Sequence, residues 1–226
     1  MIGARSLVAV AAFVTLAVGM GTGPVLGGQA ERGKAALMDP AAAKEQAPAT
    51  FRVNFDTTKG PFVIEVQRDL APLGADRFYN LVKRGFYDDA GFYRVLPEIV
   101  EFGVPADPEV WKAWRAARIV DDMRKISNLR GTVALLQVAG KDRRTTRLFI
   151  NKKDNVHLDK QAPFAPAPFG KVVTGMNVVD AIYGGYGEGA PTGKGPDTNK
   201  FDAGGSVYLK ADFPMLDFVK SATIAP

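Results

Sequence analysis

The chain has 226 residues, of which 46% are hydrophobic and 23% charged, and its formal net charge is +5. These values are typical of a globular protein with one sizeable core; they exclude wholesale disorder and do not mark a nucleic-acid-binding protein. The absence of cysteine excludes disulfides and thiolate chemistry, and a single histidine excludes a histidine-rich metal centre. With 24 Gly and 15 Pro, the composition favours a β-rich fold with many turns over a helical bundle.

The first thirty residues have the pattern of a signal peptide. Arg5 supplies a positive charge, Leu7–Val18 is apolar apart from one threonine, and Gly28-Gln29-Ala30 offers small residues at a cleavage site. The sequence therefore predicts a signal peptide over residues 1–30 and export to the periplasm or the extracellular space. The alternative is an uncleaved membrane anchor, because apolar character continues to Leu26. Only that alternative would place the protein on a membrane.

Residues 31–50 contain few aromatic side chains and predict a linker. After it, Phe51, Val53 and Phe55 alternate with polar residues, which is the period of a half-buried strand. A turn at residues 58–60 leads to a second alternating run, so we expect a hairpin over residues 51–66.

A helix is expected to begin at Pro72 and to stop at Gly85, because proline suits a first turn and glycine suits a helix end. Beyond it the pattern predicts a helical insertion with Trp111 and Trp114, a second amphipathic helix, a glycine-rich stretch, and a closing strand around Leu209. Short strands are also expected, at 92–96, 131–138, 145–151 and 169–173. The two helices are expected at 108–118 and 177–183, the glycine-rich stretch at 184–205 and the closing strand at 207–213.

The densest basic cluster is formed by Lys141, Arg143, Arg144 and Arg147. A run of charges is usually a solvated surface, so a solvated loop is the first interpretation. A patch that binds phosphate groups is the alternative.

Three segments resemble one known family. They are "RFYNLVKRGFYDDAGFYRVLP", "RRTTRLFIN" and "APFGKVVTGMNVVDAI", and in this order they are similar to the cyclophilin-type peptidyl-prolyl cis-trans isomerases from about Phe51 to Tyr183. The C-terminal stretch resembles an extension of a bacterial, exported subgroup. The resemblance implies a mainly β fold, a closed antiparallel eight-stranded barrel capped by two helices. It places this domain at residues 51–213 and leaves 214–226 as a C-terminal tail.

The resemblance also implies an activity, rotation about Xaa-Pro bonds of client polypeptides, without cofactor or metal and by a monomer. Arg94, in the segment Gly91–Val95, matches the family's catalytic arginine. Without the resemblance, Arg94 would be interpreted as an exposed strand residue on a salt-bridged face. The residues that the resemblance assigns to substrate binding are Phe92, Ile99, Val100, Glu101, Phe102, Gln137, Val138, Arg147, Phe149, His157, Leu158 and Phe164.

Several of these positions depart from the family pattern. Either Glu101 or Phe102 stands where the family has a glutamine, and Arg147 replaces a second glutamine. His157 stands where the family often has a tryptophan at the groove rim.

The substitutions bring opposite charges near Arg94. If Glu101 pairs with both Arg94 and Arg147, it holds Arg94 in place yet competes with the substrate for the hydrogen-bond donors of Arg94. Two functions therefore stay open. One is a prolyl isomerase with a weakened rate; the other is a cyclophilin-fold module or chaperone that binds proline-containing segments with little catalysis. A structural barrel on an envelope surface is a third interpretation.

Overall fold

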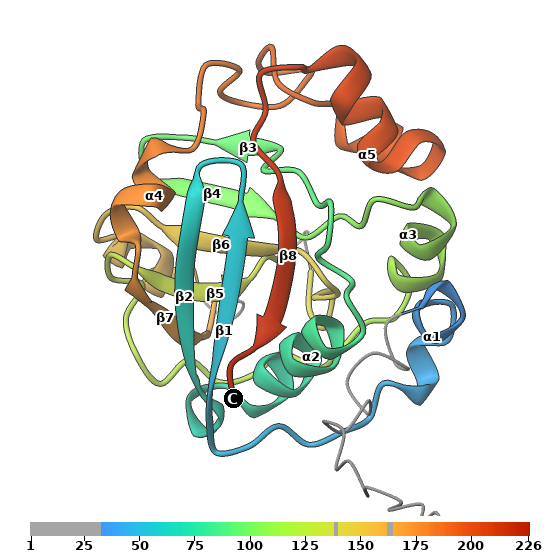
Figure 1. Cartoon of the computed structure of the whole chain (residues 1–226). Helices are drawn as coiled ribbons and strands as arrows, with labels where there is room; N and C mark the ends of the chain where they lie inside the picture. The colour runs from blue at the N-terminus through green and yellow to red at the C-terminus, as the bar shows by residue number, and fades with distance from the viewer. Residues whose placement is uncertain (1–32, 138–139, 162–164) are drawn as a thin grey trace, which may run out of the picture.

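The structure, a computed structural model, describes residues 33–137, 140–161 and 165–226. The predicted signal peptide and two predicted groove residues, Val138 and Phe164, lie outside these ranges. The sheet has eight strands, all antiparallel, in the order β3-β4-β6-β5-β7-β2-β1-β8 (Figure 1). The strands are β1 (Thr50–Thr57), β2 (Gly60–Gln67), β3 (Arg94–Val95), β4 (Ile99–Phe102), β5 (Thr132–Leu135), β6 (Leu148–Asn151), β7 (Pro168–Thr174) and β8 (Val219–Ile224).

Five α-helices and four short 3-10 helices surround the sheet within the described ranges. They are α1 (Lys34–Leu37), η2 (Pro40–Ala42), η3 (Arg68–Leu70), α2 (Pro72–Lys83), α3 (Pro108–Trp114), η4 (Val156–Lys160), α4 (Met176–Ala181), η5 (Thr198–Lys200) and α5 (Phe201–Asp212). None of the helices in these ranges is long and apolar enough to cross a membrane.

The sheet curves into a half-barrel whose two edges meet only locally. The edge strands are β3 and β8. Near them, an isolated bridge joins Gly91 to Phe218, and the amide of Phe92 donates to the carbonyl of Asp217 at 3.0 Å. The predicted closed barrel is therefore only roughly correct, since a full ladder between the edges is missing from the described residues.

The predicted hairpin is confirmed. Strands β1 and β2 pair from Thr50 with Gln67 to Thr57 with Gly60, and every second residue of β1 is buried. The rings of Phe55 and Phe62 stack at 4.8 Å between centroids. Helix α2 begins at Pro72 as predicted and buries Phe78 against this pair. The alternation of the sequence thus sets which face of the hairpin meets the core.

The predicted closing strand at 207–213 is wrong, because these residues belong to α5 and the loop after it. Helix α5 packs on α3 through Phe201 and Trp111, whose rings lie 6.4 Å apart, and together they bury a second apolar cluster. The strand that completes the sheet is β8, which pairs with β1. Residues 214–226, expected as a tail, supply this strand.

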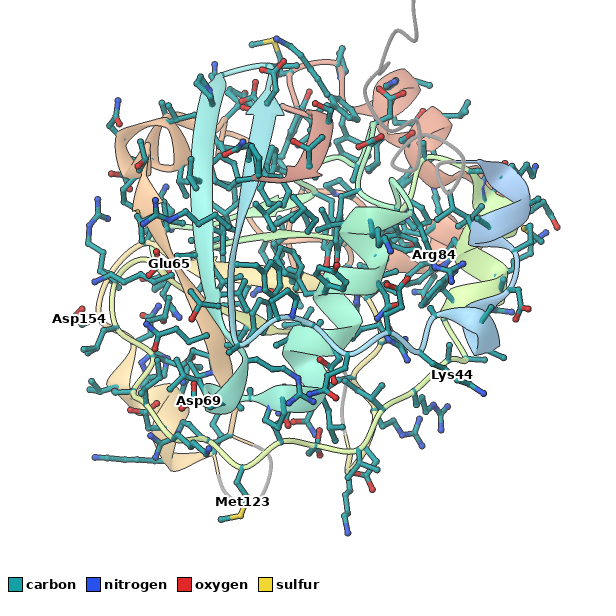
Figure 2. All side chains as sticks on the ribbon, turned by 60° about the horizontal axis from the view of Figure 1, so that its bottom comes forward. Lys44, Glu65, Asp69, Arg84, Met123 and Asp154 are labelled. Carbon is teal, nitrogen blue, oxygen red and sulfur yellow. The ribbon has the colours of Figure 1, made fainter. Side chains whose placement is uncertain are left out.

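The segment before β1, expected as a linker, is attached to the domain. Arg84 donates from Nη1 to the carbonyl of Ala36 at 2.6 Å and from Nη2 to that of Ala42 at 2.9 Å. Figure 2 shows the Arg84 side chain beside the blue N-terminal helix. Trp114 of α3 donates from Nε1 to the carbonyl of Leu37 at 2.6 Å. The predicted helical insertion therefore helps to hold this segment.

Candidate functional site

A groove of about 330 Å³ lies on the outer face of β3, β4 and β6. Its apolar lining comes from Leu96, Ile99, Leu136, Phe149, Leu158 and Pro166, and its polar lining from Arg94, Glu98, Glu101, Gln137, Asn155, His157 and Gln161. Of the predicted groove residues, the structure brings Arg94, Ile99, Glu101, Gln137, Phe149, His157 and Leu158 together here. An apolar floor with a few converging polar groups is the usual form of a binding site.

Strand β4 sorts its residues between the groove and the core. Side chains of a strand alternate between its two faces, so Ile99 and Glu101 line the groove, whereas Val100 and Phe102 are fully buried in the core. Phe92 also lies in the core, 5.2 Å from the ring of Phe102. The assignment of these three residues to the groove is corrected: they support it from behind.

Gly103 fixes the end of β4. It has a positive φ of 104°, and a Cβ added there would lie 2.5 Å from the carbonyl oxygen of Thr146. A side chain has no room at this approach, and the backbone conformation favours glycine. Thr146 in turn donates from its hydroxyl to the carbonyl of Gly103 at 3.0 Å. This close contact holds the register that points Glu101 into the groove.

The guanidinium of Arg94 lies in the groove wall between two carboxylates. Nη1 donates to Oε1 of Glu101, which is opposite Arg94 in the β3–β4 ladder. Nε and Nη2 donate to the two oxygens of Glu188 at 2.5 and 2.6 Å. The predicted pair between Arg94 and Glu101 is thereby confirmed, and the second carboxylate is a new finding.

The two carboxylates differ in environment. The Glu101 side chain is 5% exposed, and burial raises its pKa above the ordinary value, against the opposing charges of Arg94 and Arg147. The Glu188 side chain is 41% exposed, and its hydrogen bonds to Arg94 lower its pKa. The same pairing raises the pKa of Arg94, so the guanidinium is charged at every relevant pH.

A network of amides holds the rim that carries His157 and Leu158. Asn155 donates from Nδ2 to the carbonyl of Glu98 at 3.0 Å and to Oδ1 of Asn151 at 2.7 Å. Asn151 donates to the hydroxyl of Thr132 at 2.8 Å. These groups are almost fully buried, so each bond is expensive to lose. The network fastens η4 to the sheet beside the groove.

The basic cluster of the sequence is divided by the fold. Arg144 is not solvated, as the first interpretation had it, but buried. It donates to Oδ1 of Asp121 at 2.7 Å, to the carbonyl of Leu135 at 2.7 Å and to Oε1 of Gln137 at 2.7 Å. It therefore positions Gln137 at the groove. Arg147, predicted at the groove, instead lines a second cavity next to it.

Sequence reasoning missed Glu188. It lies in the glycine-rich stretch after α4, which carried no pattern of strand or helix. The only available signal was the need of Arg94 for a partner, and that need does not specify a position 94 residues further along the chain. No group of three or more acidic or histidine side chains in the described ranges is arranged to hold a metal ion.

Comparison with known proteins agrees with this geometry. The family model described as "Cyclophilin type peptidyl-prolyl cis-trans isomerase/CLD" matches residues 52–199. The chain belongs to the cyclophilin family. A protein of Acinetobacter baylyi named peptidyl-prolyl cis-trans isomerase is 35% identical over 138 residues, which is 60% of this chain and 73% of that protein. A probable peptidyl-prolyl cis-trans isomerase of Brucella abortus is 27% identical over 209 residues, covering 85% of this chain and 92% of the relative.

The fold is shared with cyclophilins of known structure. A crystal structure of a Cryptosporidium parvum cyclophilin-type peptidyl-prolyl cis-trans isomerase has a TM-score of 0.58 at 14% identity, covering 78% of this chain and 98% of that one. The structure of the same protein in the presence of the dipeptide Ala-Pro has a TM-score of 0.56. At such low identity the likeness shows the fold alone.

Proposed function

We propose that this cyclophilin catalyses the rotation of Xaa-Pro bonds in exported polypeptides, with Arg94 as the catalytic residue. The observation that carries the proposal is the position of Arg94, whose side chain is 26% exposed, in the wall of a groove whose apolar lining includes Phe149. A proline ring fits such a groove, and the predicted signal peptide supports a periplasmic or extracellular site of action.

The reaction needs a hydrogen-bond donor and a shaped pocket, not a nucleophile. Conjugation gives the prolyl bond a barrier of about 18–20 kcal/mol. In the twisted transition state the conjugation is broken, and the proline nitrogen has a free lone pair. A donor aimed at that nitrogen stabilises the transition state more than the planar ground state. Arg94 provides a donor that stays charged and rigidly oriented.

The two carboxylates do not use every donor of Arg94. A guanidinium has five N–H groups, and the bonds to Glu101 and Glu188 use one on each nitrogen. One hydrogen on each Nη is left for a substrate. The carboxylates therefore orient the guanidinium and, at the same time, reduce its positive field in the groove. We infer an isomerase whose rate is attenuated by its own ion pairs.

The same ion pairs favour a second candidate, a module that binds proline-containing segments with little turnover. If the carboxylates hold Arg94 too tightly for it to reach the proline nitrogen, the apolar groove would still bind the ring. The two candidates differ in one quantity, the rate of isomerisation per bound peptide.

A protease-coupled isomerase assay on the full mature chain separates them. For the enzyme, wild-type protein accelerates exchange and Arg94→Ala loses most of the acceleration, roughly a hundredfold if one transition-state donor is removed. Arg52→Ala is the matched control, because Arg52 pairs with Glu65 on the exposed side of the hairpin. Peptide binding without acceleration in the wild type would overturn the enzyme and support the binding module.

A further inference from the structure

A second cavity of about 210 Å³ is lined largely by arginine. Its described lining is Trp111, Arg115, Arg118, Arg143, Thr145, Arg147 and Thr198. These residues come from α3 and the loop after it, from the segment before β6 and from η5. Segments distant in the sequence thus converge to place positive charges around one hollow.

Three of these charges have no carboxylate partner. Arg118, Arg143 and Arg147 form no ion pair with any acidic group in the part of the chain that the structure describes. The neighbouring Arg144 shows the contrast, since Asp121 pairs with it at 2.7 Å. Like charges that converge repel one another, and an anion bound between them reduces this cost.

A buried hydroxyl lies beside the same cavity. The Tyr93 side chain is in the apolar cluster with Trp111 and is 1% exposed, and its hydroxyl has no hydrogen-bond partner among the described residues. The ring of Tyr93 lies 5.1 Å from that of Phe201, which lies 6.4 Å from the ring of Trp111 in the cavity lining. Burial raises the pKa of Tyr93, and the charge of Arg147 acts in the opposite direction. Arginine has no acceptor atom, so even the nearby Arg147 leaves the O–H of Tyr93 without an acceptor, and this buried donor is a second sign that an anionic group fits here.

The cavity adjoins the groove. Glu101 accepts from Nη1 of Arg94 on the groove side, and the charge of Arg147 also acts on it. Phe149, which lines the groove and lies opposite Glu101 in the β4–β6 ladder, is only two residues from Arg147, which lines the cavity. A peptide whose proline occupies the groove would present a neighbouring side chain to the arginine-lined cavity.

We propose that this cavity binds an acidic or phosphorylated side chain of the client, so that the isomerase selects proline segments with a negative charge close to the proline. Guanidinium groups bind carboxylate and phosphate in paired, charge-assisted hydrogen bonds. A lysine at the same client position is repelled. The proposal rests on the proposed function and adds the substrate class to it.

The test is a ratio of rates. Glu and Gln are compared at each of the positions within three residues of the proline, in otherwise identical peptides. At one position, kcat/KM is expected to favour Glu by roughly five- to tenfold at low salt, because the cavity is open to water and its charges are screened. Phosphoserine at that position is expected to raise the preference further.

The double variant Arg118→Gln/Arg143→Gln is expected to bring the Glu/Gln ratio close to one, whereas Arg52→Gln retains it. A ratio near one at every position in the wild type, or a preference that survives in the double variant, overturns the proposal. Binding of inorganic phosphate alone, without any Glu preference, overturns it as well.

The proposed function is tested separately by turnover of the Gln peptides. If the Gln peptides are not turned over, the affinities of the Glu and Gln peptides are measured by calorimetry with the same variants. The ratio of these affinities then tests the proposed cavity, with the same values expected as for the rates.

Discussion

Replacement of Glu101 by glutamine is the sharpest perturbation of the groove. The amide has the shape of the carboxylate but no charge, so the bond from Nη1 of Arg94 loses the attraction between two opposite charges. Glu101 is buried, and the bond is therefore little screened. A hydrogen bond to a charged group contributes about 1.5–3 kcal/mol net.

Only the part of this energy that opposes the shift of Arg94 toward the proline nitrogen affects the rate. If half of it does, the barrier falls by about 1 kcal/mol, and kcat/KM rises by roughly five- to tenfold. Glu188→Gln removes an exposed, better-solvated partner, so its gain is at most about fivefold.

The assay is protease-coupled isomerisation of one proline peptide at low enzyme concentration. Glu65→Gln is the control, because Glu65 pairs with Arg52 on the hairpin and does not line the groove (Figure 2). An unchanged or lower rate in Glu101→Gln, with an unaltered unfolding transition, would show that Glu101 only orients Arg94 and does not compete for its donors.

Three further outcomes are expected. The pKa of Glu101 is raised and that of Glu188 is lowered, so acidification neutralises Glu101 first. We therefore expect kcat/KM to rise as the pH falls through the pKa of Glu101. This rise should be absent in Glu101→Gln. The pKa of Glu101 is higher in the folded than in the unfolded state, so its protonation stabilises the fold. Titration of Glu101 therefore does not lower the rate by unfolding the protein, and a fall in kcat/KM over this pH range would contradict the account. Arg144→Met breaks a buried pair and should lower the free energy of unfolding by about 3 kcal/mol in urea, against about 0.5 for the exposed Arg143→Met. Deletion of residues 219–226 removes β8 and should abolish cooperative unfolding; a truncated chain that still melts cooperatively would show that the strand is dispensable.

The sequence was informative where a local period decides the structure. Phe51, Val53 and Phe55 alternate over a full strand, and Pro72 marks the start of a helix, so both elements are found as predicted. The closing strand failed because Val207 and Leu209 are apolar at a spacing that suits either a strand or a helix. Packing on α3 selects the helix, and such packing is not visible in a local window.

The prediction of the site was correct where local motifs decide it and wrong or incomplete where the fold decides it. Arg94 and Phe149 were found because family motifs surround them. The family motif alone predicts Val100 and Phe102 in the groove, whereas the alternation of strand β4 places both in the core. Glu188 depends on a contact between segments far apart in the chain, and no local rule predicts it.

The central claim is that Arg94 stabilises the twisted transition state of a prolyl bond, although Glu101 and Glu188 both bind its guanidinium. Exchange NMR on a proline peptide measures the interconversion of its cis and trans forms at equilibrium, without a coupling protease. Uncatalysed exchange takes tens to hundreds of seconds. The account predicts exchange well above this rate with wild-type protein, a further increase with Glu101→Gln and near-background exchange with Arg94→Ala. Equal exchange with wild type and Arg94→Ala would contradict it.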